Sequence, residues 1–428
     1  MPWCNLLSNH IIIAFFYDFS IFPVLFLCFL CIIYAKTGEK VKKLLFSLYG
    51  FAFFNKFLLL TPVYAIFMQA NGLSDMQLST MFIVSAFGTI LGQFPITFIT
   101  NRLGQRWSMI LGQFLKIFAV LLWLVFPTYI GFFIGMFFWG IQAGFRSVAF
   151  EGLVFDSVAS YGAADEYPRI LGRKSTYESI GTALSACGSL LMFLGYDWVT
   201  WASVVSVLLS IVCLLMVRYE HPMPQHVSKN QIKKMFRSGM KICLKTPCLL
   251  SVMILSLLVV NVPFLDDFLS PIALQLGIQT EYVGIVSFFL LGCATLGQRF
   301  AYRFTRISDW LLYSMIGFVG VLYVLFACVY TSGALWMMGC AYMLFYGIYT
   351  LLYSRFQHMI PPSHRSVVLS LYTTLTYIVY MLVCGVIGLG AKIGDWRYSI
   401  GILGIMMMVV CVWAFARVLS RCRLPSVD

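Results

Sequence analysis

Long apolar runs separated by short polar breaks dominate the chain. Most runs are close to the ~20 residues that an α-helix needs to cross the hydrocarbon core of a membrane. A membrane β-barrel would instead show alternating segments of about ten residues. The pattern therefore predicts an all-α polytopic membrane protein with thirteen spans. They lie near residues 11–34, 44–69, 77–100, 107–126, 129–157, 175–195, 197–217, 247–274, 280–302, 309–329, 333–357, 366–390 and 397–417.

The composition agrees with this prediction. Of the 428 residues, 61% are hydrophobic and only 11% are charged, whereas a soluble domain carries about 25% charged residues. The sequence contains neither a phosphate-binding Walker loop nor a His/Cys/carboxylate cluster with metal-ligand spacing. No nucleophilic triad is visible either. We therefore expect no enzyme activity, no cofactor and no bound metal.

The net charge of +13 could indicate nucleic-acid binding, but its distribution indicates membrane topology. Alternate loops, among them 35–43 and 218–245, hold 23 of the 29 Lys and Arg residues, and the opposite loops hold only Lys392 and Arg397. Short cytoplasmic loops retain Lys and Arg because positive residues are hard to translocate. We therefore expect a cytoplasmic C terminus, a location in the inner (cytoplasmic) membrane, and no nucleic-acid partner.

The long basic loop divides the last twelve spans into two sets of six. This division predicts a six-helix bundle over residues 44–217, a cytoplasmic linker over 218–245 and a second six-helix bundle over 246–420. A cytoplasmic tail follows over 421–428. Two parallel repeats of this kind are a known architecture of secondary transporters.

The N-terminal segment, residues 1–43, has two interpretations. Its apolar run at 11–34 is long enough to form an extra, thirteenth transmembrane helix with the N terminus outside. Alternatively, the start is over-extended and the functional chain begins near Val41, because "VKKLLFSLYGF" reads like the basic start of a transporter. The second interpretation is preferred.

The loop between the second and third of the twelve spans carries a spaced pattern of polar residues around one glycine. Its members are Gln93, Asn101, Arg102, Gly104 and Arg106. Three further patterns follow along the chain. They are Glu151-Gly-Leu-Val-Phe-Asp156-Ser in the fourth span, Gly172-Arg173 after it, and Arg365-Ser-Val-Val-Leu-Ser at the start of the eleventh span.

In this order, the four patterns resemble those of the major facilitator superfamily over residues 44 to about 420. The resemblance implies two six-helix bundles that work by alternating access. It also implies that the first, fourth, seventh and tenth of the twelve helices line a central cavity. The residues to which it gives a coupling or gating role are Gln93, Asn101, Arg102, Gly104, Arg106, Glu151, Asp156, Arg173 and Arg365.

The loop pattern departs from the family in its charge. The family has acids where this chain has Asn101 and Gln93, and these amides can hydrogen-bond but supply no charge. We therefore expect the turn at Gly104 to be kept and the electrostatic latch of the loop to be weakened. Asp156 or Glu178 are the alternatives for the missing counter-charge.

Polar and ionisable residues within the expected cavity helices are the candidates for a substrate site, because a charge in the membrane is costly unless it faces a cavity or a partner. The candidates are Asn55, Lys56, Gln142, Arg146, Asp267, Tyr346 and Tyr349. Lys56 and Arg146 either bind an anionic group of a solute or form buried pairs with Glu151 or Glu178.

Three acids and one lysine need separate consideration. Glu151 could carry a proton, but a structural or gating role is favoured. Asp266 and Asp267 are adjacent, so at most one of them is expected to face the cavity. Lys116 lies on a helix that the resemblance makes peripheral, and no role is assigned to it.

The sequence thus predicts a secondary active transporter for a small organic anion or zwitterion, such as a siderophore or another metabolite. The expected partners are this solute, a proton or other coupling ion, and the lipid bilayer, and the expected state is a monomer. A multidrug-type efflux pump and a non-transporting scaffold or sensor remain alternatives.

Overall fold

The computed structural model describes residues 39–161, 166–217, 240–241, 243–304, 307–361, 364–393 and 395–419. The apolar run at 11–34, most of the predicted linker and the tail over 421–428 lie outside the described residues. The hypotheses on the extra helix and on the start site therefore stay predictions. Within the described residues the structure is helical and contains no strand, which confirms the predicted fold class.

The helices fall into two sets that follow the two halves of the chain. The first set consists of α3 (Glu39–Lys56), α4 (Tyr64–Ala70), α5 (Asp75–Val125), α6 (Tyr129–Ser160), α7 (Tyr167–Ser185), α8 (Cys187–Leu190), η2 (Leu191–Leu194) and α9 (Tyr196–Met216). The second consists of α11 (Pro247–Asn261), η3 (Asp266–Phe268), α12 (Leu269–Gln275), η4 (Thr280–Tyr282), α13 (Val283–Ala301), η5 (Tyr302–Phe304), α14 (Asp309–Val329), η6 (Ser332–Ala334), α15 (Leu335–Met359), α16 (Arg365–Ile393) and α17 (Trp396–Leu419).

Ten helical stretches of the described residues are long and apolar enough to cross a membrane. The two remaining predicted spans, near 44–69 and 77–100, correspond to α3–α4 and to the first part of α5. The chain is therefore a multi-pass membrane protein, and twelve spans are consistent with its structure. The two parts of α5 meet at Gly104, whose backbone is not helical.

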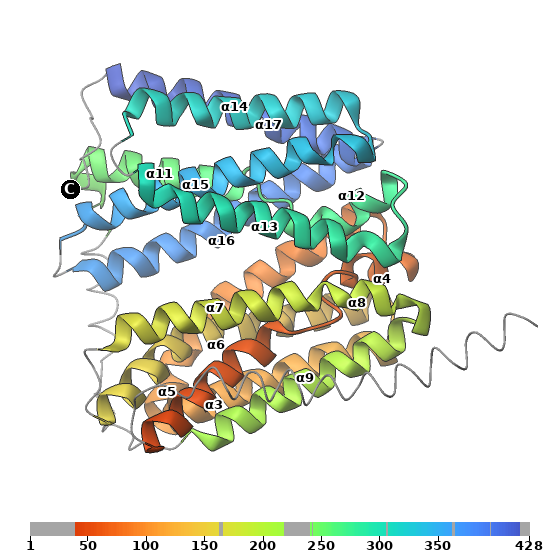
Figure 1. Ribbon diagram of the computed structural model, residues 1–428, viewed down its shortest axis with the longest axis vertical. Helices are drawn as coiled ribbons and strands as arrows, with labels where there is room; N and C mark the ends of the chain where they lie inside the picture. Colours follow the sequence, from red (N-terminus) through yellow and green to blue (C-terminus); the bar gives the residue numbers. More distant parts are fainter. Residues whose placement is uncertain are drawn as a thin grey trace, which may run out of the picture.

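Figure 1 shows the two sets side by side, with their long helices roughly parallel. We call the end at which α17 finishes the tail end, and the end that holds α4, α8 and α12 the far end. The halves meet at the far end. There the Gly284 amide donates to Ser189 Oγ (2.9 Å), and Ser189 Oγ donates to the Glu281 carbonyl (2.9 Å). Toward the tail end the helices of the two halves spread apart (Figure 1).

The first predicted span of each half is broken, whereas the sequence analysis treated both as continuous. In the first half the helix stops at Lys56 and resumes at Tyr64, and in the second it stops at Asn261 before η3. Both breaks contain a proline, Pro62 and Pro263. Proline has no backbone N–H and its ring clashes with the preceding turn, so it does not continue a helix.

Side chains of neighbouring helices satisfy the backbone groups that the breaks release. Lys116 Nζ donates to the Asn55 carbonyl (2.9 Å), and Ser206 Oγ donates to the Phe54 carbonyl (3.0 Å). Tyr323 donates its hydroxyl to the Pro263 carbonyl (2.5 Å). Such partners are required because an unsatisfied backbone group in the membrane costs several kcal/mol.

Candidate functional site

A cavity of about 380 Å³ lies between the halves, beside the break in the first span. Its volume falls in the range of about 300–1,000 Å³ that is typical of small-molecule sites. Helices α3–α7 supply most of its wall, and η3 and α16 complete it from the second half. The polar residues that line it include Asn55, Lys56, Thr61, Tyr64, Ser85, Thr89, Lys116, Gln142, Arg146, Thr182, Asp267, Tyr377 and Tyr380.

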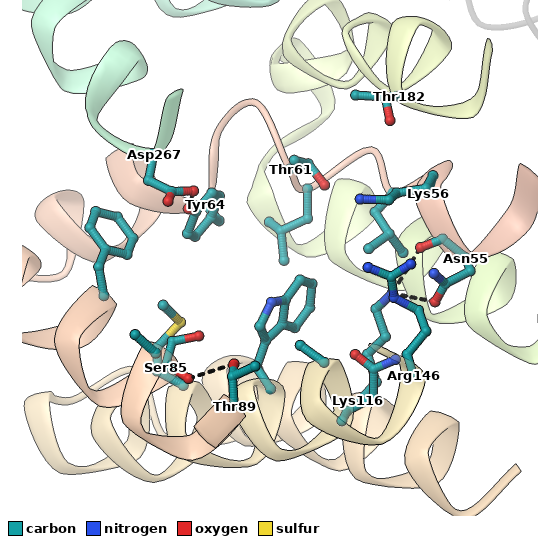
Figure 2. A pocket seen from close by; sticks show the side chains of 18 of the residues that line it. Asn55, Lys56, Thr61, Tyr64, Ser85, Thr89, Lys116, Arg146, Thr182 and Asp267 are labelled. Atoms are coloured by element: carbon teal, nitrogen blue, oxygen red, sulfur yellow. Dashed lines mark hydrogen bonds between the residues drawn. The ribbon is translucent and has the colours of Figure 1, made fainter. Parts of the chain in front are cut away.

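The charges of this cavity are separated. Figure 2 shows Lys56, Lys116 and Arg146 gathered with Asn55 on one side, and Tyr64 and Asp267 on the other. Aromatic and aliphatic side chains of the wall lie between the two groups. A solute in the cavity would therefore meet three basic side chains at one end and one acidic side chain at the other.

Lys56 is the cation with the fewest partners. It is the last residue of α3, where the partial negative charge of a helix C terminus favours a cation. Among the described residues, no hydrogen bond or ion pair holds its ammonium group. The group is therefore free to bind a ligand in the cavity.

Arg146 already has a carboxylate partner. Its Nη1 lies 3.4 Å from Glu178 Oε1, and Lys174 Nζ lies 3.4 Å from Glu178 Oε2. Of the two acids that the sequence analysis left open as partners, Glu178 thus makes this pair, whereas Glu151 is exposed on α6. The Arg146 guanidinium also lines the cavity, so it can share its donors between Glu178 and a solute.

Lys116 is a cavity residue that the sequence analysis missed. Its side chain is 3% exposed. Its Nζ donates to the carbonyl oxygen (2.9 Å) and to Oδ1 (3.1 Å) of Asn55, and it lies 5.1 Å from the ring centre of Trp139. Pro62 was the signal in the sequence. A proline interrupts a helix, and the interruption leaves backbone carbonyls that need a buried hydrogen-bond donor.

Asp266 and Asp267 face two different cavities, and only Asp267 lines the main one. Asp267 lines the main cavity and accepts hydrogen bonds from the hydroxyls of Tyr64 (2.7 Å) and Tyr380. Asp266 lines a second cavity of about 130 Å³ and accepts from the Tyr346 hydroxyl (3.1 Å). The physical reason is that η3 lies between the halves, with a cavity on either side of it.

Most of the predicted cavity residues come together. Asn55, Lys56, Gln142, Arg146 and Asp267 line the main cavity, and their role in binding a substrate stays a prediction. Tyr346 lines the second cavity instead, and Tyr349 lines neither of these two. Tyr349 stacks on Tyr353, with ring centres 5.6 Å apart.

The loop between the two parts of α5 lies at the tail end. Gly104 has φ +80° and ψ 163°, a conformation that is essentially restricted to glycine, and this confirms that the turn requires it. Arg106 donates from Nε to the Leu214 carbonyl (3.0 Å) and from Nη2 to the Leu215 carbonyl (2.6 Å). The loop is therefore attached to the C terminus of α9.

The other predicted gating residues are not brought together with the cavity. The side chain of Asn101 lies outside the described ones. Arg102, Glu151, Arg173 and Arg365 are exposed, Gln93 and Asp156 are partly buried, and none of them lines either cavity. Glu178, an alternative for the counter-charge of the loop, pairs here with Arg146, which lines the main cavity, and with Lys174.

Replacing Arg106 by glutamine is expected to lower the free energy of unfolding by about 1 kcal/mol, because it removes a cation from the carbonyls at the end of α9. The change is measured as the thermal unfolding midpoint of the purified protein. Arg102→Gln is the matched control, since Arg102 is exposed on the same loop. Equal midpoints for the two variants would show that the Arg106 contacts add no stability.

The fold is similar to those of solved transporters. A mutant form of the nucleoside transporter NupG superposes with a TM-score of 0.71 at 11% identity, over 87% of this chain and 99% of that one. A D-xylose–proton symporter gives 0.68 at 14% identity, over 90% and 97%. A bacterial homologue of the human lysosomal transporter Spinster, inward-facing and unoccupied, gives 0.67 at 15% identity, over 92% and 100%.

Comparison with curated protein sequences returns no match. The sequence itself matches the family described as Major Facilitator Superfamily over residues 45–383. This match extends through both halves and includes the charged cavity, the loop at Gly104 and most of α16. The chain therefore belongs to the Major Facilitator Superfamily.

Proposed function

We propose that the protein is a secondary active transporter that moves a small organic anion or zwitterion by proton-coupled alternating access. The observation that carries this proposal is the group of basic side chains on one side of the main cavity, above all Lys56 and Arg146. Lys56 has an ammonium group without a protein partner among the described residues, and Arg146 has donors left beside Glu178.

The chemistry of the cavity favours an anionic group at this end. A guanidinium binds a carboxylate or phosphate through two parallel hydrogen bonds, and a nearby ammonium adds a point charge. Phe82, Trp123 and Trp139 offer apolar surface for a carbon skeleton. Asp267, on the opposite side, supplies an acceptor for a cationic or hydroxyl group of the same solute (Figure 2).

The contacts between the halves support alternating access. The halves are joined at the far end and spread apart at the tail end (Figure 1). We place the tail end in the cytoplasm, because the ends of the helices that border the basic loops of the sequence lie there, and these loops hold 23 of the 29 Lys and Arg residues. In this orientation the structure faces inward.

A ligand-stabilisation screen tests the proposal. We expect organic mono- and dicarboxylates, organic phosphates or zwitterions to raise the thermal unfolding midpoint of the purified protein, and the matched uncharged esters to leave it unchanged. Each stabilising compound is then tested for uptake into proteoliposomes with and without an imposed pH gradient. Stabilisation by lipophilic cations alone would indicate a multidrug-type pump, and absence of both stabilisation and uptake would indicate a scaffold or sensor.

A further inference from the structure

The second cavity lies between the halves, on the other side of η3 from the main cavity. It measures about 130 Å³ and is lined by Thr61, Asp266, Ser270, Tyr342 and Tyr346, together with apolar residues of α12 and α13. This is less than half of the smallest typical small-molecule site, at about 300 Å³. It has room for a few water molecules, each of which takes up about 30 Å³. The cavity therefore suits water and a proton rather than an organic solute.

Asp266 is the only ionisable acid in the described lining of this cavity, and its side chain is exposed to it. Among the described residues, no Lys, Arg or His forms an ion pair with it. The titratable groups that face it are Asp267 on its own segment, Tyr64 on α4, Tyr323 on α14, and Tyr342 and Tyr346 on α15. The linings from α7 and α13 add hydroxyls and apolar groups but no charge.

Tyr342 and Tyr346 form the hydroxyl surroundings of this carboxyl group. The Tyr342 side chain is 2% exposed and its hydroxyl lies beside Asp266, and the Tyr346 hydroxyl donates to Asp266 Oδ2 (3.1 Å). An ionised carboxylate can accept hydrogen bonds from both hydroxyls, whereas a protonated carboxyl donates its own hydrogen and accepts fewer. The two hydroxyls are therefore sensitive to the protonation state of Asp266.

We propose that Asp266 carries the coupling proton and that Tyr342 and Tyr346 are its hydroxyl partners. The inference rests on the proposed function, because it assigns the coupling site of that transport cycle. The proton passes from a hydronium ion in the second cavity to a carboxylate oxygen of Asp266, which leaves water behind. In the state that is open to the other side, it returns to water. An acid of this kind inside a membrane protein marks a proton path when it faces a water-filled cavity.

The position of Asp266 links the proton to the gate between the halves. Its neighbour Asp267 accepts a hydrogen bond from Tyr64 of the first half, so it joins the halves at the far end. The two carboxylates are adjacent on the short helix η3. A change of charge on Asp266 therefore acts on the segment that holds the gate.

Infrared difference spectroscopy tests the assignment with protons as the only ligand. The purified protein is reconstituted in lipid, and the pH is lowered from about 8 to about 6, a range in which exposed carboxylates with a reference pKa near 4 stay ionised. We expect the carbonyl stretch of a neutral carboxyl to appear. It should be lost in Asp266→Asn and retained in Glu151→Gln, whose carboxyl is exposed on α6.

A second variant keeps the test decisive if Asp266→Asn does not fold. Tyr342→Phe leaves the carboxyl in place and removes a hydroxyl that can donate to its ionised form, so the midpoint of the band should move up by about one pH unit. A band that persists in a folded Asp266→Asn protein, or a midpoint that Tyr342→Phe leaves unchanged, would overturn the assignment. Suppression of the band by NaCl but not by choline chloride would show that Asp266 binds a sodium ion as the coupling ion, which would overturn the assignment of a proton.

The measurement also separates this inference from the proposed function. It uses no organic solute, so a negative result leaves the solute screen unaffected. Conversely, a screen without any stabilising solute would not remove a proton-dependent band at Asp266.

Discussion

Replacing Lys56 by glutamine is expected to raise the KM for the transported anion about 10- to 150-fold while the protein stays folded. Lys56 has no ion-pair or hydrogen-bond partner among the described residues, so the substitution leaves no buried protein charge unpaired. A hydrogen bond to a charged group in a sheltered site is worth about 1.5–3 kcal/mol, and about 1.4 kcal/mol corresponds to a factor of ten. The measurement is initial uptake into proteoliposomes, with the thermal unfolding midpoint recorded in parallel.

Arg146→Gln provides the contrast, because Arg146 has a protein partner. Its loss weakens the neutralisation of Glu178, so the unfolding midpoint should fall. Adding Glu178→Gln should recover part of the loss, since removing both members of a pair leaves less uncompensated charge. If Lys56→Gln had a normal KM and a normal midpoint, Lys56 would not bind the solute.

The fold class, and the choice of most polar residues that line the main cavity as candidates, followed from features that a linear pattern retains. Span length and the distribution of Lys and Arg can be read from a sequence without knowing how the helices pack. Lys56, Arg146 and Asp267 stood out because an ionisable residue within an apolar run needs a cavity or a partner. Their placement around one cavity followed from the order of the helices in the family that the chain resembles.

The features that the sequence analysis missed depend on three-dimensional partners. Hydropathy along 44–69 and 247–274 does not reveal the breaks, because the intervening residues are as apolar as the helices. Pro62 and Pro263 were the available signals. Lys116 was left without a role because its helix was expected to be peripheral, and its partners, the carbonyl oxygen and Oδ1 of Asn55, are 61 positions away in the sequence.

The direction of neighbouring side chains was equally hard to predict. At most one of Asp266 and Asp267 was expected to face the cavity, and the second cavity, which Asp266 lines, was not predicted. The choice between Glu151 and Glu178 as partner of Arg146 needed the relative positions of α6 and α7. In the structure Glu178 faces Arg146 across these helices, whereas Glu151 is exposed.

Removing the contact between the halves at the far end is expected to have the second large effect. The hydroxyls of Tyr64 and Tyr380 both donate to Asp267, but only Tyr64, on α4, comes from the other half of the protein. Tyr380 lies on α16, in the same half as Asp267. Tyr64→Phe therefore removes a hydrogen bond that exists only while the far end is closed, whereas Tyr380→Phe removes one within the second half.

We expect Tyr64→Phe to shift the equilibrium toward the state with an open far end by about 1.5–3 kcal/mol, or about 10- to 150-fold, because the lost hydrogen bond has a charged acceptor. Ser79 reports on this opening. It is 2% exposed on α5 and packs against Gly388 of α16, so a cysteine at this position is protected while the halves touch. The modification rate of Ser79→Cys by a membrane-impermeant thiol reagent, followed by mass spectrometry of its peptide, should rise by that factor in Tyr64→Phe and stay close to the parent rate in Tyr380→Phe. Equal rates in both tyrosine variants would show that the Tyr64–Asp267 contact does not hold the far end closed. Tyr380→Phe also removes a hydrogen bond to Asp267, but it breaks no contact between the halves.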